Sequence, residues 1–547
     1  MAFLRAQYIG ICLPQAARHY GRLPVVMHGF ALRAMPLRDR IPLPDNDSLN
    51  QTMQFFVKKI TMTSTVYVST IEKRPEGGFM AFSVHDGILE KRHDSNTITE
   101  KHMTQEMNIR LERIGTLKRD PQAAKHGSCW MLGCETLDRD FADFQKYKSY
   151  LPALGIPLIR LQAGWAKTEK EKGKYDFSWL DRIVDDAMEL GLKCLLETDY
   201  GNPIYEGGGG WDLAGGFPTS EEALAAWDAW VENLVLHFRD RVDEWAMWNE
   251  PDISKENSMD AIVDFNIRTG TIVRKLAPNS KIAGLSLARS DAAYFEKCLT
   301  QLKEKGADNL FDSYIYHGYK YNPDEASDNG LKLKAVLAKL GIRGVLRQGE
   351  NGCPSEETQK FALRDYPWTE LSQAKWDLRR FIGDYCTGVH SSVFTACDFN
   401  HIGRQINRKG LLMADENHNV IRPKLVYGAI QNMTTLFNDL LEPAVGAGAI
   451  RYSKQTQFFT FKNRGKKLAV FWDRSSTPSN ETATGSADIL MRDFAFREPV
   501  IIDVLSGNVY QLPPESVKNC GEFTVYTEIP CADTPFVLCD KLLVNIG

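Results

Sequence analysis

The chain has 547 residues, of which 43% are hydrophobic and 25% charged, and this length predicts a globular protein of two or three domains. The net charge of −4 gives no basic footprint for nucleic acid, and no apolar run reaches the roughly 18 residues that a membrane span requires. The 11 cysteines contain no C-x-x-C pair, which argues against disulfide frameworks and zinc sites and favours a reducing compartment. We therefore expect a cytoplasmic protein without metal, cofactor, nucleic-acid or membrane partners.

The N-terminal region differs in composition from the rest. Residues 1–45 are rich in arginine and interrupted by prolines, so we expect a poorly ordered extension rather than a secretory signal. Residues 46–128 are predicted to form an N-terminal β-strand segment and linker. Strand-like alternation runs from Thr52 to Leu89, and the charged stretch from Lys91 to Lys125 reads as helix or linker. The early strands either complete a C-terminal sheet or cap the next domain.

From Cys129 onward, strand-like and helix-like stretches alternate. This pattern predicts a parallel (β/α)8 TIM barrel over residues 129–438. A doubly wound sheet is the alternative, but no glycine-rich phosphate loop follows the first strand. The expected strands are 130–133, 157–161, 193–198, 242–248, 281–285, 312–316, 344–347 and 392–396. The expected helices include 140–151, 179–190, 220–238, 259–276, 371–385 and 426–436.

The last part of the chain contains short β-like segments at regular spacing. We expect residues 439–547 to form an accessory antiparallel β-sandwich. Its expected strands are 458–462, 468–472, 487–491, 500–505, 522–528 and 535–538.

Two glutamates end predicted barrel strands in matching settings. Glu250 lies in Trp-Asn-Glu-Pro after the fourth strand, and Glu350 lies in Gln-Gly-Glu-Asn-Gly after the seventh. Functional residues of such barrels lie at the C-terminal ends of the strands. Retaining glycoside hydrolysis requires two carboxyl groups roughly 5–5.5 Å apart, one protonated and one ionised. The alternative is that both are ordinary carboxylates that cap loops.

This arrangement resembles the clan A retaining glycoside hydrolases, over roughly residues 129–436. The resemblance implies that Glu250 is the acid and Glu350 the nucleophile. It also implies that Arg160, at the end of the second strand, favours the ionised nucleophile. Asn249 would bind the sugar 2-hydroxyl.

The sixth strand ends in Tyr-His-Gly-Tyr, which matches the His-x-Tyr of the clan. The resemblance implies that Tyr319 donates a hydrogen bond to the nucleophile and that His317 lies near the acid or the sugar.

Other candidates lie in the loops. Trp165, after the second strand, and Trp211, in a glycine-rich loop that we expect to be mobile, are candidate platforms for sugar stacking. Glu135 would bind a sugar hydroxyl or form a salt bridge. The eighth strand departs from the clan because it lacks the usual tryptophan, and Phe394, Phe399 or a loop aromatic would replace it.

The sequence thus predicts a hydrolase of carbohydrate metabolism or polysaccharide degradation: a retaining β-glycosidase acting on a β-linked oligosaccharide or glycoside. A non-catalytic carbohydrate-binding protein on the same barrel is the alternative. An aldolase or isomerase would call for a strand-end lysine or a phosphate site, and neither is visible. The cluster of Asp398, Asn400 and His401 is interpreted as hydrogen-bonding rather than metal-binding.

Overall fold

The computed structural model describes residues 106–123, 129–401, 405–438, 441–463, 466–492 and 495–547, together with strands β1 (Thr70–Lys73) and β2 (Met80–Ser83). The chain divides into two compact units, residues 1–100 and 101–547. In the first unit, β1 and β2 pair as an antiparallel hairpin within the region predicted to contain strands. The extension predicted for residues 1–45 lies outside the described residues.

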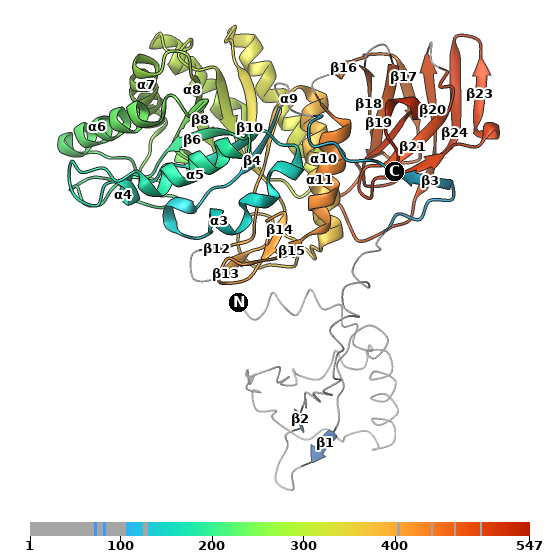
Figure 1. Cartoon of the computed structure of the whole chain (residues 1–547), viewed down its shortest axis with the longest axis horizontal. Coiled ribbons are helices and arrows are strands. Elements are labelled where there is room, and N and C mark those ends of the chain that lie inside the picture. Colours follow the sequence, from blue (N-terminus) through green and yellow to red (C-terminus); the bar gives the residue numbers. More distant parts are fainter. Residues whose placement is uncertain are drawn as a thin grey trace, which may run out of the picture. The chain divides into compact units, whose positions relative to one another are not determined.

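The second unit contains a closed barrel of eight parallel strands, which confirms the predicted TIM barrel (Figure 1). Its strands follow one another in chain order around the barrel. They are β4 (Trp130–Gly133), β5 (Leu158–Gln162), β6 (Lys193–Thr198), β7 (Glu244–Met247), β8 (Lys281–Leu287), β9 (Ser313–Tyr316), β10 (Val345–Asn351) and β11 (His390–Val393).

Helices connect the strands and surround the barrel (Figure 1). They are α3 (Phe144–Tyr147), α4 (Trp165–Thr168), α5 (Ser178–Glu189), α6 (Glu221–Phe238), α7 (Met259–Leu276), α8 (Ala292–Glu304), α9 (Pro323–Leu340), α10 (Glu370–Thr387) and α11 (Leu425–Leu436). The first predicted helix, 140–151, is instead the short α3 followed by 3-10 turns. Asp140 has a left-handed backbone, and the side chain of Asp143 accepts from the N–H of Gln145 as an N-cap, so the helix begins only at Phe144.

The barrel interior is built in layers. The lower layer is an apolar cluster contributed by alternate strand positions: Met131, Leu158, Leu195, Ala246, Ala283 and Ile315. Side chains two residues further along a strand point to the same face. Arg160, Glu197 and His317 follow cluster members at this spacing, and all three are buried. The upper layer of the barrel is therefore polar, although these three side chains are buried.

Between β11 and α11 the chain forms two hairpins that the sequence pattern did not predict. They are β12 (Phe399–His401) with β13 (Gln405–Asn407), and β14 (Leu412–Ala414) with β15 (Val420–Pro423).

The C-terminal strands form two antiparallel sheets. One contains β16 (Glu442–Pro443), β18 (Thr456–Asn463), β19 (Lys466–Asp473), β25 (Phe536–Asp540), β21 (Pro499–Asp503), β22 (Asn508–Gln511) and β3 (Glu112–Thr116), in this order. The other contains β17 (Gly448–Arg451), β20 (Gly485–Arg492), β24 (Phe523–Cys531) and β23 (Val517–Cys520).

Strand β3 corrects one prediction. It lies in the charged stretch that was predicted as helix or linker, and it pairs with β22 at the edge of the larger sheet, where Figure 1 shows it beside the C-terminal strands. An N-terminal strand therefore completes the C-terminal sheet, but it is not one of those predicted between Thr52 and Leu89.

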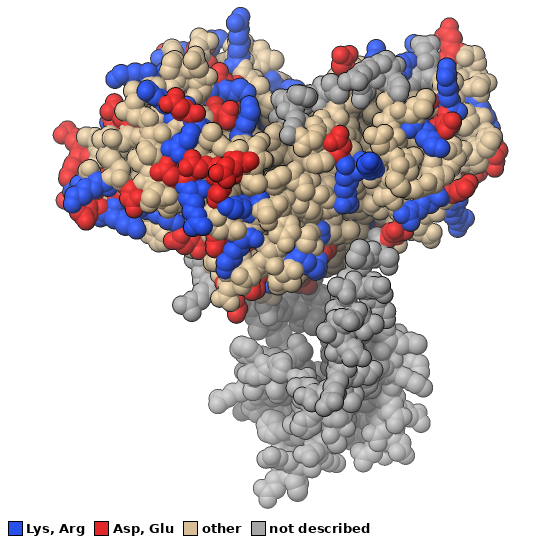
Figure 2. Space-filling model, in the orientation of Figure 1, with Lys and Arg blue, Asp and Glu red and all other residues tan. Residues whose placement is uncertain are grey.

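Helix α10 connects the barrel to the sheets. The buried Lys375 ammonium binds Asp533 at 2.7 Å and the carbonyl of Ser479 at 3.0 Å. On the face shown in Figure 2, acidic and basic side chains are interspersed. Within the described residues, no helix is both long enough and apolar enough to span a membrane.

Candidate active site

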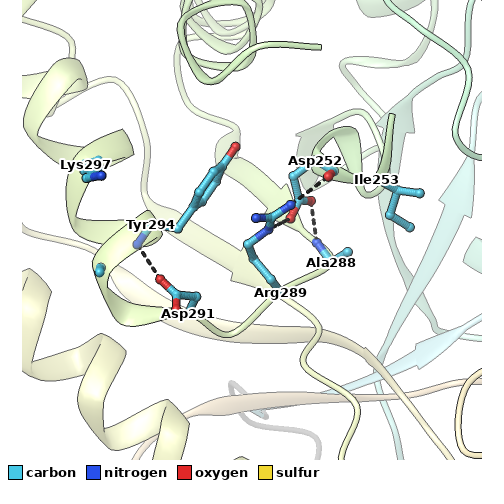
Figure 3. Close-up of a pocket in the computed structure, with 8 residues that line it drawn as sticks. Asp252, Ile253, Ala288, Arg289, Asp291, Tyr294 and Lys297 are labelled. Carbon is cyan, nitrogen blue, oxygen red and sulfur yellow. Dashed lines mark hydrogen bonds and ion pairs between the residues drawn. The ribbon is translucent and has the colours of Figure 1, made fainter. Parts of the chain in front are cut away.

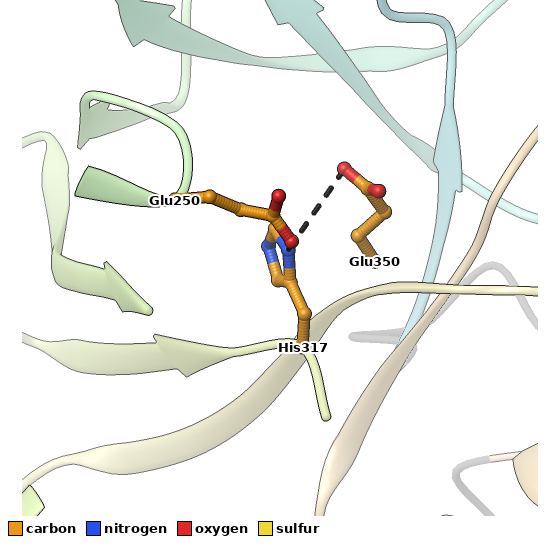
Figure 4. Close-up of side chains that lie close together, drawn as sticks. All are labelled: Glu250, His317 and Glu350. Carbon is orange, nitrogen blue, oxygen red and sulfur yellow. Dashed lines mark hydrogen bonds and ion pairs between the residues drawn. The ribbon is translucent and has the colours of Figure 1, made fainter. Parts of the chain in front are cut away.

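The two predicted catalytic glutamates lie at the same end of the barrel. Glu250 follows β7, and Glu350 is part of β10. A carboxyl oxygen of one lies within 4.8 Å of a carboxyl oxygen of the other. Both side chains are about one-tenth exposed, at 10% and 11%. Figure 4 shows the two carboxyl groups with the imidazole of His317 beside them.

The guanidinium of Arg160 contacts four side chains and the carbonyl of Gly349, the latter at 3.3 Å from Nη1. Its Nη1 donates to Oε2 of Glu350 at 3.1 Å and to Oε1 of Glu135 at 2.8 Å. Its Nη2 donates to Oε1 of Glu197 at 2.7 Å and to Oδ1 of Asn249 at 2.6 Å. One cation therefore lies among three buried carboxyl groups, where the sequence suggested a single partner.

Each oxygen of Glu350 accepts a hydrogen bond. Oε2 is bound by Arg160, and Oε1 accepts from the hydroxyl of Tyr319 at 3.0 Å. The Nδ2 of Asn249 donates to the hydroxyl of Tyr200 at 2.9 Å. An amide has two N–H groups, so Asn249 keeps one that can bind a sugar hydroxyl.

His317 lies on the side of the acid candidate. Its Nδ1 is 2.7 Å from Oε1 of Glu250 and 3.9 Å from Oε2 of Glu350. Its main-chain carbonyl accepts from Nδ2 of Asn351 at 2.7 Å, which fixes the segment after β9 to β10. This histidine is fully buried.

The two glutamates have pKa values shifted in opposite directions. Burial raises the pKa of Glu250, and the contact with His317 only partly offsets this effect. Burial also acts to raise the pKa of Glu350, but the charges of His317 and Arg160 outweigh it, so the net pKa is lowered. A proton is thus held at Glu250 at a pH where Glu350 is ionised.

Glu135, in the loop after β4, belongs to the network of carboxyl groups around Arg160. Its side chain is 2% exposed, and it binds Arg160. A Cβ at Gly133 would lie 2.3 Å from Oε2 of Glu135, so only glycine leaves room for this carboxyl group. Burial, with a smaller contribution from the charge of Glu350, raises the pKa of Glu135 to about 8. Of the two roles considered for this residue, the contact with Arg160 favours the salt bridge, which forms as the carboxyl group ionises at about pH 8.

Trp165 is not a sugar-stacking platform, which corrects the prediction. Its side chain is fully buried and stacks on Tyr205 and Trp230, with centroid distances of 5.6 and 5.9 Å. Its indole N–H donates to Glu169 at 2.6 Å. A tryptophan with both faces covered and its N–H bonded is a core residue.

Trp211 lies in the loop between β6 and α6 and is 50% exposed, so its ring is open to solvent. The loop itself is held by backbone hydrogen bonds, from Gly201 N to Gly210 O and from Asn202 N to Gly208 O. A Cβ at Gly208 would lie 2.0 Å from the carbonyl oxygen of Asn202. The glycines therefore permit close backbone packing, and the mobility of this loop stays a prediction.

Phe394 directly follows β11, at the position where the clan usually has a tryptophan. Its ring packs edge-to-face on Phe399, with a centroid distance of 5.7 Å, and Phe394 is 8% exposed. Of the aromatic residues considered for this role, Phe394 is the one that lies directly at the end of the strand.

Sequence reasoning missed several buried polar residues of the site. Glu197 is within the third barrel strand, and Asp199 and Tyr200 follow it. The position of Glu197 near the end of a predicted strand was the available signal. Asp199 has no hydrogen-bond partner for either carboxyl oxygen within the described residues, and burial raises its pKa well above the usual range.

Among the described residues, the group close enough to hold a metal ion is Glu250, His317 and Glu350. Arg160 contacts Glu350 directly, and its charge opposes cation binding there. Asp398, singled out in the sequence, binds Lys424 at 2.6 Å and Arg408 at 3.0 Å. Its oxygens are thus engaged in salt bridges, as the hydrogen-bonding interpretation implied.

A separate pocket of about 680 Å³ lies between the residues just after Glu250 and those that follow β8 (Figure 3). Its lining includes Asp252, which binds Arg289 at 2.6 Å, and Tyr294, whose ring lies 4.3 Å from the Arg289 guanidinium. Neither Glu250 nor Glu350 lines it. The candidate active site is therefore defined by the strand ends and not by this pocket.

Two comparisons with known proteins each match a short stretch of the chain. Residues 137–203 match the glycoside hydrolase 42 family, described as beta-galactosidase. The beta-galactosidase BbgII of Bifidobacterium bifidum is 36% identical over 69 residues, which are 13% of this chain and only 9% of that protein.

Solved structures share the fold. A family 39 glycoside hydrolase from Bacteroides cellulosilyticus WH2 has a TM-score of 0.58 and 16% identity, over 78% of this chain and 82% of that chain. A monomeric beta-xylosidase from Caulobacter crescentus CB15 has a TM-score of 0.51 and 13% identity, over 80% of this chain and 99% of that chain. The matches confirm the resemblance to clan A glycoside hydrolases, and they assign no individual family.

Proposed function

We propose that the protein is a retaining β-glycosidase that acts by double displacement. The observation that carries the proposal is the pair of carboxyl groups, with oxygens within 4.8 Å of each other and pKa values shifted in opposite directions. Retaining enzymes hold their carboxyl groups roughly 5–5.5 Å apart, whereas inverting enzymes leave roughly 6.5–9.5 Å for a water molecule.

In the first step, Glu350 attacks the anomeric carbon while the bond to the leaving oxygen breaks. Glu250 gives its proton to that oxygen, and a covalent glycosyl-enzyme forms. Glu250 is then ionised and removes a proton from water, which attacks the anomeric carbon and releases the sugar. Both carboxyl groups return to their starting protonation states.

Different residues contact the two glutamates. Arg160 and Tyr319 each donate to Glu350 and so favour its ionised form. His317 contacts Glu250 through Nδ1. Since this nitrogen shares a hydrogen bond with the acid, His317 holds the Glu250 carboxyl group in place while its charge changes during the cycle.

A non-catalytic carbohydrate-binding protein is the alternative. Such a protein has no need for a carboxyl group held ionised beside one held protonated. The complete set of contacts around Glu350 therefore favours catalysis.

Screening against aryl-β-glycosides tests the proposal directly. We would begin with β-galactosides and β-xylosides, because the relatives with these activities share sequence or fold with this chain. Turnover whose first product is the β-anomer supports the proposal. Proton NMR during the reaction identifies this anomer. Release of an α-configured product would indicate inversion, and saccharide binding without turnover would favour the alternative.

A further inference from the structure

A buried lysine contacts the segment just after the candidate nucleophile, and no ion-pair partner for it lies among the described residues. Lys409 is in the turn between β13 and β14 and is 1% exposed. Its Nζ donates to the carbonyl of Gly352 at 3.0 Å and to that of Ala362 at 2.6 Å. No described carboxylate lies within ion-pair distance of it. A buried cation is costly, so this arrangement calls for an explanation.

The ammonium of Lys409 also contacts the ring of Tyr319, with 4.9 Å from Nζ to the ring centroid. The hydroxyl of that ring is the group that donates to Glu350. The carbonyl of Lys409 accepts from the backbone N–H of Thr395 at 3.4 Å. One residue thus contacts the segments that follow β9, β10 and β11.

The charged and titratable groups that face Lys409 come from three elements. They are Tyr319 after β9, Glu350 and Cys353 in and after β10, and Asp377 on α10. Burial raises the pKa of Asp377 and of Cys353 well above their usual ranges, so both are neutral in the acidic range. Glu350 is then the ionised group among those that face the lysine.

Burial lowers the pKa of Lys409 to about 8. The lysine therefore stays charged throughout the acidic range, where a glycosidase loses activity as its nucleophile is protonated. An effect of its charge on Glu350 is therefore observed at acidic pH, where Glu350 titrates. The lysine itself loses its proton only at higher pH.

We propose that Lys409 is a positioning residue, whose ammonium holds Tyr319 and the segment after Glu350 in place and whose charge favours the ionised nucleophile. The inference rests on the proposed function, in which Glu350 is the nucleophile. A purely structural lysine would hold the segment at 352–369 to β13 and β14 without affecting the titration of Glu350.

The test compares Lys409→Met and Lys409→Gln with wild type. Lys409→Gln retains a hydrogen-bond donor but carries no charge. It replaces Lys409→Met in the assays if the methionine variant does not fold. Lys334→Met is the matched control, because the half-buried Lys334 also donates to two backbone carbonyls, those of Thr387 and Gly388, and has no ion-pair partner among the described residues.

Both Lys409 variants should lower kcat/KM by about tenfold or more, since small misplacements of catalytic groups have large costs. The acidic limb of the pH profile should move up by about half a unit or more, because an opposite charge has been removed. The control should leave the limb unmoved. An unmoved limb in both Lys409 variants would overturn the electrostatic part of the proposal.

A double-mutant cycle with Tyr319→Phe tests the positioning part. If Lys409 acts through the Tyr319 hydroxyl, Lys409→Met should cost less than about threefold in kcat/KM in that background, because coupled residues are not additive. Full additivity would overturn positioning through Tyr319.

One readout needs no turnover and so separates this inference from the proposed function. The carboxyl ¹³C shift of Glu350, assigned with Glu350→Gln, reports its pKa directly. It should titrate at higher pH in Lys409→Met than in wild type, even if no glycoside is hydrolysed. An equal titration in both proteins would contradict the inference, and absence of wild-type turnover alone would contradict only the function.

Discussion

Arg160 Nη1 lies 3.1 Å from Oε2 of Glu350, although the two residues are 190 positions apart in the chain. The contact crosses the inside of the barrel from β5 to β10. Because Glu135 and Glu197 bind the same guanidinium, its charge is shared among three carboxyl groups. Protonation of any one of them changes how strongly the others are bound.

The first prediction concerns Arg160→Met. This variant should lose turnover and move the acidic limb to higher pH, because the charge that favours ionised Glu350 is removed. It should also lose roughly 3–5 kcal/mol of stability, since it leaves buried carboxyl groups without their partner. Activity assays and thermal denaturation measure the two effects.

Arg347→Met is the matched control for Arg160→Met. Arg347 is also buried in the barrel, where it binds Glu244 at 3.0 Å and contacts the sulfur of Met131 in the lower layer. Its loss should destabilise the protein while leaving the acidic limb in place. If Arg160→Met kept near wild-type turnover with an unmoved limb, Arg160 would be a structural residue only.

The second prediction separates the roles of the two glutamates. Glu350→Ala should abolish turnover, and azide should restore it with an α-configured glycosyl azide, because azide then attacks directly in place of the nucleophile. Glu250→Ala should lose about 10²–10⁴-fold on substrates with poor leaving groups and much less on activated aryl substrates. With Glu250→Ala, azide should give a β-configured product. The opposite configurations would show that the assignments are reversed.

Much of the site was predicted from the sequence. Glu250 and Glu350 were predicted from their positions at strand ends, Arg160 and His317 from the resemblance to the clan, and the barrel brings them together. The prediction from strand ends works because parallel strands place these ends at one mouth, whatever their separation in the chain.

The errors have a common physical cause, because local pattern does not specify long-range packing. Trp165 follows a strand as a platform residue would, but its burial depends on Trp227 and Trp230 in a distant helix. Strand β3 pairs with β22 from the other end of the chain, and its charged sequence carries no signal of that partner. Lys409 lies in a turn, and only the folded loops bury it.

The third prediction concerns the pH dependence of catalysis. The pKa of Glu350 is lowered, so activity should fall on the acidic side as the nucleophile becomes protonated. The pKa of Glu250 is raised, so activity should fall on the basic side as the acid loses its proton. The kcat/KM profile should therefore be bell-shaped, with macroscopic values that belong to the coupled pair. In Glu250→Gln, the basic limb should disappear for activated aryl substrates. A basic limb that persisted there would belong to another group.

The last prediction concerns stability and Glu135. Burial raises the pKa of Glu135 from 4.5 to about 8, so between these values the folded protein holds a proton that the unfolded chain releases. The stability that this proton contributes is fully present below about pH 4.5 and is lost as the pH rises through 8. Glu135→Gln removes the titration. Its Tm relative to wild type should therefore increase steadily from pH 5 to pH 8 in thermal denaturation. Glu171→Gln, which removes an exposed carboxyl group, serves as the control and should show no such trend. A constant difference between Glu135→Gln and wild type across this range would mean that Glu135 is ionised beside Arg160 throughout.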